Sequence, residues 1–80
     1  MQIEDGVKKI FFEIFQNLSE DKFSLGTLRR EFENWDSLAH MQLVSEMENV
    51  FGVRFEIGEI VDVETPQGFV DLLKKKKNIQ

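Results

Sequence analysis

The residues best suited to chemistry lie close together in the stretch N-W-D-S-L-A-H, residues 34–40. Asp36 and Ser37 are adjacent, and His40, the chain's only histidine, follows three positions after the serine. A nucleophilic serine needs a general base beside it, but a helix that begins at Ser37 turns His40 toward its core side. The chain contains no cysteine, which excludes cysteine nucleophiles, thiolate metal sites and disulfides. We therefore expect no catalytic residue and no metal site, and we interpret His40 as a packed or capping residue.

Ser37 itself has two interpretations. Serine is a preferred residue at a helix N-cap, so Ser37 could simply start a helix, although Asp36 alone could cap the same helix. Alternatively, the hydroxyl is a point of attachment. A helix N-terminus presents free N–H groups and the positive end of the helix dipole, both of which stabilise a phosphate.

The elements that must position Ser37 are predicted to be helices. Apolar residues recur at helical spacing over residues 3–18 and predict a first helix there. Phe12 lies outside its buried arc and is either exposed or packed under the following loop. Residues 19–36 lack clean periodicity, so we expect a long loop with room for one helical turn. Apolar side chains should pin this loop across the core, namely Phe23, Leu25, Leu28, Phe32 and Trp35.

A second helix is predicted over residues 37–51, where Gly52 provides a C-terminal stop. On a helical wheel its core face comprises Leu43, Val44, Met47, Val50 and Phe51. Leu38 and Met41 fall on the outer side, close to Ser37, and Ser45 and Glu48 share that side. Two neighbouring apolar residues that the core does not require indicate a contact surface.

The remainder of the chain predicts a short helix and a final one. Residues 53–64 alternate as a strand would, but no other segment is suited to pair with them. We favour a short helix around Gly58–Asp62, with its apolar residues turned inward: Phe55, Ile57, Ile60 and Val61. Thr65 as N-cap and Pro66 as first residue begin the last helix, and Lys74 to Lys77 suit the negative end of its dipole. The predicted fold is an all-α, small four-helix bundle (three main helices plus one short helix) that forms a single domain over residues 1–80.

Charge is distributed unevenly along the chain. The net charge is −5 overall, but residues 33–64 carry eight acids against one base, Arg54, a net −7. This acidity argues against nucleic acid as a partner and favours partners with basic surfaces, although solubility alone also requires charge. The acids we consider candidates for steering such partners are Asp36, Glu46, Glu48, Glu59 and Asp62. With no apolar run of membrane-spanning length and no signal peptide, we expect a cytoplasmic monomer without a membrane partner.

Taken together, these features resemble the acyl carrier proteins of fatty acid, polyketide and related biosynthesis. The resemblance covers nearly the whole chain, from the amphipathic first helix and long loop to D-S-L at residues 36–38, F-G at 51–52 and T-P at 65–66. It implies that Ser37 carries 4′-phosphopantetheine, whose thiol holds acyl groups as thioesters. The implied partners are a phosphopantetheinyl transferase and acyl-loading and acyl-using enzymes with basic docking surfaces. Leu38 and Met41 would provide an apolar platform beside the attachment site.

The chain also departs from the family pattern. Asn34 and Trp35 stand where many members have glycine before the aspartate. Ala39, Gln42 and Asn49 stand where many have acids, which indicates a specialised discrete carrier. A peptidyl or D-alanyl carrier remains an alternative, as does an unmodified helical protein-interaction module that uses the Leu38/Met41 face. A hydrolase is disfavoured because an acid–base pair is lacking.

Overall fold

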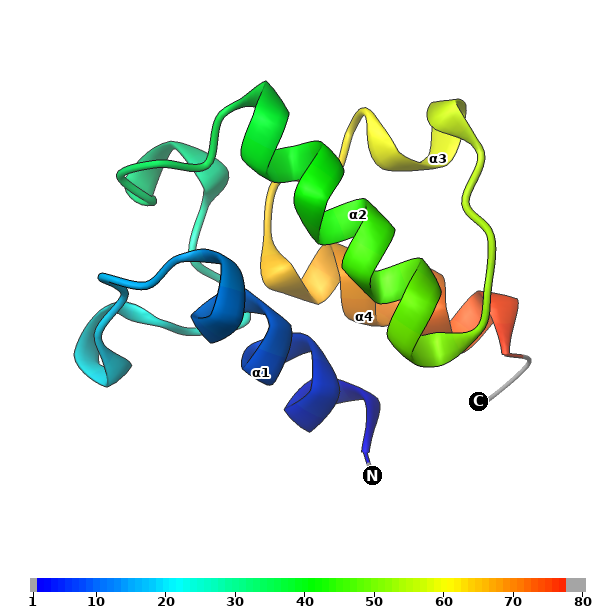
Figure 1. The fold of residues 1–80 in the computed structure, drawn as a ribbon, viewed down its shortest axis with the longest axis horizontal. Coiled ribbons are helices and arrows are strands. Elements are labelled where there is room, and N and C mark those ends of the chain that lie inside the picture. The colour runs from blue at the N-terminus through cyan, green and yellow to red at the C-terminus, as the bar shows by residue number, and fades with distance from the viewer. Residues whose placement is uncertain (1, 78–80) are drawn as a thin grey trace.

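Residues 2–77, the part of the chain that the computed structural model describes, form helices and loops and no strand. The three longer helices are α1 (Ile3–Ile14), α2 (Ser37–Phe51) and α4 (Pro66–Lys76), and α3 (Ile57–Ile60) is a single turn. Two 3-10 turns, η1 (Glu20–Lys22) and η2 (Arg29–Glu31), interrupt the long loop between α1 and α2. In Figure 1, α2 crosses the bundle and α3 lies beside it. The predicted all-α bundle with a long first loop is confirmed.

Helix α1 is shorter than predicted. The periodicity indicated residues 3–18, but the helix ends at Ile14, and Phe15 leaves helical geometry with φ −101° and ψ 87°. Phe15 is still buried and Leu18 still packs against the core. The apolar residues therefore continue at helical spacing beyond the end of the helix, because the turn at residues 16–18 also directs side chains toward the core. This is why the sequence pattern predicted a helix that is too long. Phe12 packs against Phe23 of the loop, with ring centroids 5.5 Å apart.

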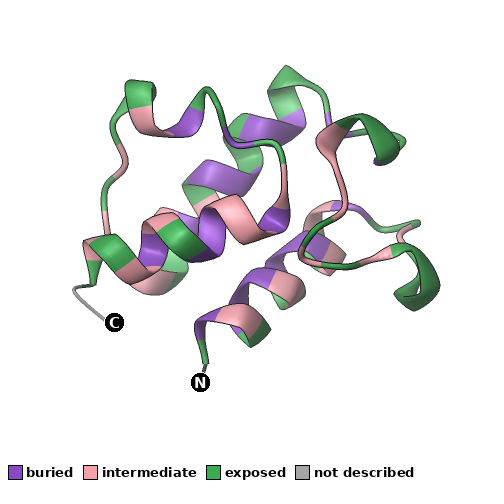
Figure 2. Cartoon of the chain, turned by 180° about the vertical axis from the view of Figure 1, so that it is seen from behind, coloured by how far each residue is buried: buried purple, intermediate pink, exposed green. Residues whose placement is uncertain are grey.

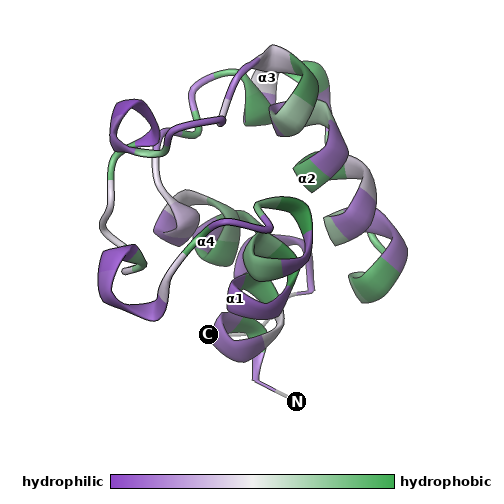
Figure 3. Cartoon of the chain, turned by 60° about the vertical axis from the view of Figure 1, so that its left-hand side comes forward, coloured by the Kyte–Doolittle hydropathy of each residue, from purple (hydrophilic) through white to green (hydrophobic). Residues whose placement is uncertain are grey.

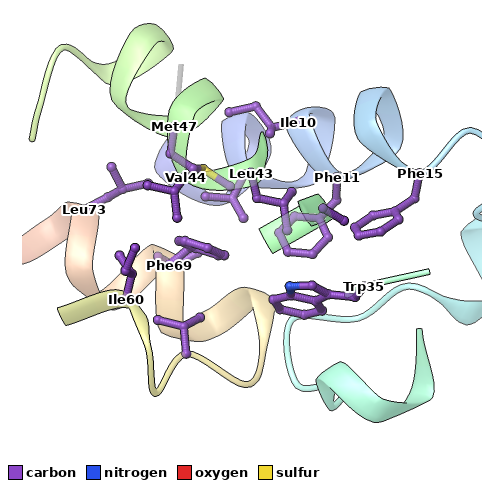
Figure 4. Packing of buried hydrophobic residues seen from close by; sticks show 14 of the residues in the cluster. Ile10, Phe11, Phe15, Trp35, Leu43, Val44, Met47, Ile60, Phe69 and Leu73 are labelled. Atoms are coloured by element: carbon purple, nitrogen blue, oxygen red, sulfur yellow. The ribbon is translucent and has the colours of Figure 1, made fainter. Parts of the chain in front are cut away.

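Aromatic side chains dominate the core around the end of α1. The ring of Phe11, fully buried, lies 5.2 Å from that of Trp35, 5.6 Å from that of Phe32 and 6.2 Å from that of Phe69. Figure 4 shows Phe11, Trp35 and Phe69 facing one another, with Leu43 and Val44 of α2 above them. The long loop is therefore part of the core, as its apolar residues predicted.

Backbone hydrogen bonds also hold the loop against the start of α4. The N–H of Arg29 donates to the carbonyl of Glu64 (2.6 Å), and the N–H of Gln67 donates to the carbonyl of Leu25 (2.8 Å). Figure 3 shows that the two 3-10 turns, by contrast, place hydrophilic residues at the outside. The loop thus has a fixed path that leads residues 32–36 to the start of α2.

The predicted ends of α2 and α4 are confirmed. Gly52 terminates α2 with φ 67°, in the left-handed region that glycine adopts without a Cβ clash. Thr65 caps α4 by accepting from the N–H of Gly68 (3.2 Å), and Pro66 is the first helical residue. At the other end of α4, Lys76 pairs with Glu59 and Lys74 pairs with Glu4.

Three apolar residues that we predicted to face inward do not. Val50 is 44% exposed, Ile57 75% and Val61 54%, whereas Ile60 is buried and Phe55 packs partly against the core. Ile60 enters the core from the single turn of α3, whereas Ile57 at the start of that turn and Val61 directly after it are exposed to solvent. Val50 lies in the last turn of α2. The helical wheel gives the direction of its side chain but cannot show whether another segment packs against it there. Figure 2 shows how burial concentrates on the inner faces of the long helices while the α3 region is largely exposed.

Candidate functional site

Helix α2 is capped by Asp36. Its carboxylate Oδ1 accepts a hydrogen bond from the N–H of Ala39 (2.8 Å), and its backbone is extended, with φ −95° and ψ −172°. This is the geometry of an N-cap residue. Of the two residues that the sequence offered for this role, Asp36 is the cap and Ser37 is the first residue of the helix.

Ser37 is consequently available for another role. Its side chain is exposed, and within residues 2–77 its hydroxyl has no hydrogen-bond partner. It lies at the positive end of a 15-residue helix, where a phosphate is electrostatically favoured. A solvent-accessible hydroxyl at this position suits a phosphate ester.

His40 is not placed to activate this hydroxyl. The imidazole is buried, its Nδ1 accepts from the indole Nε1–H of Trp35 (2.9 Å), and its Nε2 bonds to the carbonyl of Ile60 (2.8 Å). Both ring nitrogens are therefore committed to structure, and the expectation of a packed histidine is confirmed. Trp35 is held in turn by Arg29, whose Nε donates to the Trp35 carbonyl (3.2 Å).

The described residues also contain no group of three or more His, Cys, Asp or Glu side chains that could hold a metal ion.

Leu38 and Met41 lie on the outer side of α2, as predicted. Leu38 is 70% and Met41 50% exposed. Ile57, the first residue of α3, and Val61, which directly follows α3, add two exposed apolar side chains. The bond between His40 and the Ile60 carbonyl joins α2 to α3, so the two helices present these side chains from a fixed relative position.

The five acids considered for partner steering differ in their surroundings. Asp62 is exposed and Glu46 half-buried, and Asp36 is the helix cap. The carboxylate of Glu48 accepts from the N–H of Phe55 (2.8 Å), fixing the segment between α2 and α3. Glu48 therefore has a structural role that wheel position alone did not indicate.

Glu59 likewise has partners within the chain. Its Oε1 accepts from the N–H of Glu56 (2.8 Å) and lies 2.8 Å from the ammonium of Lys76. The backbone hydrogen bond and then the lysine lower the pKa of this carboxyl below its ordinary value of 4.5. Of the five candidate acids, Asp62 and Glu46 are therefore the two whose side chains have no hydrogen bond or ion pair with another described residue.

Residues 34–73, half of the chain, match the family model described as the phosphopantetheine attachment site. The chain belongs to this family. Comparison with curated proteins and with solved structures gave no match.

Membership of the phosphopantetheine attachment family supports the resemblance to acyl carrier proteins. Proteins with this domain are carriers and not themselves catalysts, and the domain is where 4′-phosphopantetheine is covalently attached. Its partners include a phosphopantetheinyl transferase and biosynthetic enzymes. The capped start of α2, with Ser37, lies within the matched residues. No helix among residues 2–77 has the length and apolar character needed to cross a membrane.

Proposed function

We propose that the chain is an acyl carrier protein and that 4′-phosphopantetheine is attached to Ser37. The observation that carries this proposal is the division of roles at the start of α2. Asp36 satisfies the helix N-terminus, which leaves the Ser37 hydroxyl exposed beside the positive end of the helix. The arm supplies the thiol that a chain without cysteine lacks, and acyl groups are carried on it as thioesters.

Partner enzymes are proposed to dock on the outer side of α2. Leu38 and Met41 provide apolar contacts next to Ser37, and the exposed side chains of Ile57 and Val61 offer further ones at α3, which lies beside α2. Asp36, Glu46, Glu48, Glu59 and Asp62 contribute negative charge around it. Weak, charge-assisted contacts suit a carrier that must visit several enzymes and leave each one quickly.

A treatment of the purified protein with coenzyme A and a phosphopantetheinyl transferase tests the attachment. Intact-mass measurement should show the gain of one phosphopantetheine, and peptide mapping should place it on Ser37. Ser37→Ala should abolish the gain. Ser45, exposed on the same helix, provides the matched control, because Ser45→Ala should be modified like the unaltered protein.

Two results would contradict the proposal. A Ser37→Ala protein that is still modified would place the attachment elsewhere. A correctly folded protein that several transferases of broad specificity leave unmodified would favour the alternative of an unmodified interaction module that uses Leu38 and Met41.

A further inference from the structure

A groove opens directly beside Ser37. It lies between the end of α1, residues 31–36 and the first turns of α2, and its volume is about 470 Å³. Asp36 and Leu38, the two neighbours of Ser37 in the chain, both line it. The backbone point of attachment of a group on Ser37 therefore lies between two residues of the groove lining.

The lining of the groove combines apolar and carboxamide side chains. Buried Phe15 and partly buried Leu18 contribute apolar surface, and Leu38 adds more beside Ser37. Asn17, Asn34 and Gln42 are exposed and contribute side-chain amides, each with donors and an acceptor. Such a lining suits a ligand that alternates amide groups with aliphatic carbon.

Charge disfavours a free anion as the occupant. Three carboxylate residues line the groove, Glu31, Glu33 and Asp36, against a single cation, Lys22. A free fatty acid or an inorganic phosphate would face net negative charge there. A neutral chain of amides and methyl groups would not, since its phosphate would remain outside at the Ser37 oxygen.

We infer that this groove is a resting site for the pantetheine portion of the arm on Ser37, an inference that depends on the proposed function. The two amides of pantetheine would hydrogen-bond to the side chains of Asn17, Asn34 and Gln42, and its dimethyl carbon would pack on Phe15 and Leu18. Covalent attachment makes this binding intramolecular, with an effective concentration in the millimolar range. Weak contacts therefore suffice to hold the arm between visits to enzymes, and a partner can withdraw it at little cost.

Comparison of amide NMR spectra of the apo and holo forms tests the inference. The resonances expected to shift on modification are the side-chain amides of Asn17 and Gln42 and the backbone amides of residues 16–18. All of these except Gln42 are distant in sequence from Ser37. Gln42→Trp places a large side chain in the groove and should abolish the holo-minus-apo shift differences at residues 16–18. Asn49→Trp, at an exposed position of the same helix outside the groove lining, should leave them unchanged.

Thiol reactivity with a neutral alkylating reagent gives a second measurement on the same samples. An arm that rests in the groove about two-thirds of the time should react about threefold more slowly than free pantetheine, and Gln42→Trp should restore the faster rate. A modified protein whose shifts are confined to residues next to Ser37, and whose thiol reacts as fast as free pantetheine, would overturn the resting site but leave the carrier function intact. Absence of modification at Ser37 would overturn both.

Discussion

The indole Nε1–H of Trp35 donates to Nδ1 of His40 across 2.9 Å, and this bond joins the last residues of the long loop to α2. Because Nδ1 accepts, the ring hydrogen lies on Nε2, which donates to the Ile60 carbonyl at 2.8 Å. Three polar groups are thereby satisfied inside an apolar core. The relay fixes the loop, α2 and α3 relative to one another.

Loss of the His40 ring should destabilise the fold. His40→Leu retains an apolar side chain of moderate size but leaves the Trp35 indole and the Ile60 carbonyl without their partner. An unsatisfied buried polar group costs about 1–3 kcal/mol, and the free energy of unfolding should fall by at least that amount. Urea titration followed by the fluorescence of Trp35, the only tryptophan, measures it. Unchanged stability would show that the relay contributes nothing to the fold.

The cap and the charge of Asp36 can be separated. Asp36→Ala removes the acceptor for the Ala39 N–H and should cost about 0.5–2 kcal/mol, whereas Asp36→Asn retains a capping oxygen and should cost little. Denaturant unfolding of both variants tests the cap. If Asp36→Asn is stable but is modified more slowly by the transferase, the charge serves recognition. If the Asp36→Ala variant is as stable as the unaltered protein, Asp36 is not the residue that caps α2.

Truncation of the two methionines of α2 should have very different effects on the free energy of unfolding. Met47 is fully buried, and Met47→Ala should cost about 2–5 kcal/mol. Met41 is 50% exposed, so Met41→Ala should leave the free energy of unfolding nearly unchanged while weakening partner docking. Denaturant unfolding of the two variants provides the comparison. Similar large losses in both would mean that Met41 is part of the core.

Glu59 should contribute to acid sensitivity. The Glu56 N–H and then Lys76 favour its ionised form, and its pKa is lowered from 4.5. The stabilisation it provides is therefore complete above pH 4.5 and is lost as the pH falls through the lowered pKa. Glu59→Gln should reduce stability at pH 7 and flatten the further loss between pH 5 and 3, measured by thermal unfolding across that range. An acid profile parallel to that of the unaltered protein would contradict this role.

Negative charge near the docking surface should accelerate modification by the transferase. Exposed charges act weakly, about 0–1 kcal/mol each, and are screened over roughly 8–10 Å at physiological salt. Asp62→Lys should slow modification at low salt but have little effect at high salt, while Leu38→Ala should slow it at both. Asp21→Lys, the same charge change at exposed η1, is the control. If the modification rate changes neither with salt concentration nor on Asp62→Lys, the acidic region serves solubility and not recognition of the transferase.

Much of the fold follows from local sequence. Thr65 and Pro66 begin α4 and Gly52 ends α2 because caps and stops depend on a few adjacent residues. The proposal that Ser37 is the attachment site likewise began from the D-S-L stretch, since a helix start and a serine suited to carry a phosphate are both local features. The buried arc of α1 was also readable, although its end at Ile14 was not.

Tertiary structure decided which side chains remain free for partners. Glu48 bonds to the Phe55 N–H and Glu59 to Lys76, so two of the five predicted steering acids have structural partners that no periodicity reveals. The exposure of Ile57 and Val61, the Trp35–His40–Ile60 relay and the groove beside Ser37 are of the same kind. Each depends on how segments distant in sequence pack against one another, whereas helical spacing fixes only the direction in which a side chain leaves its own helix.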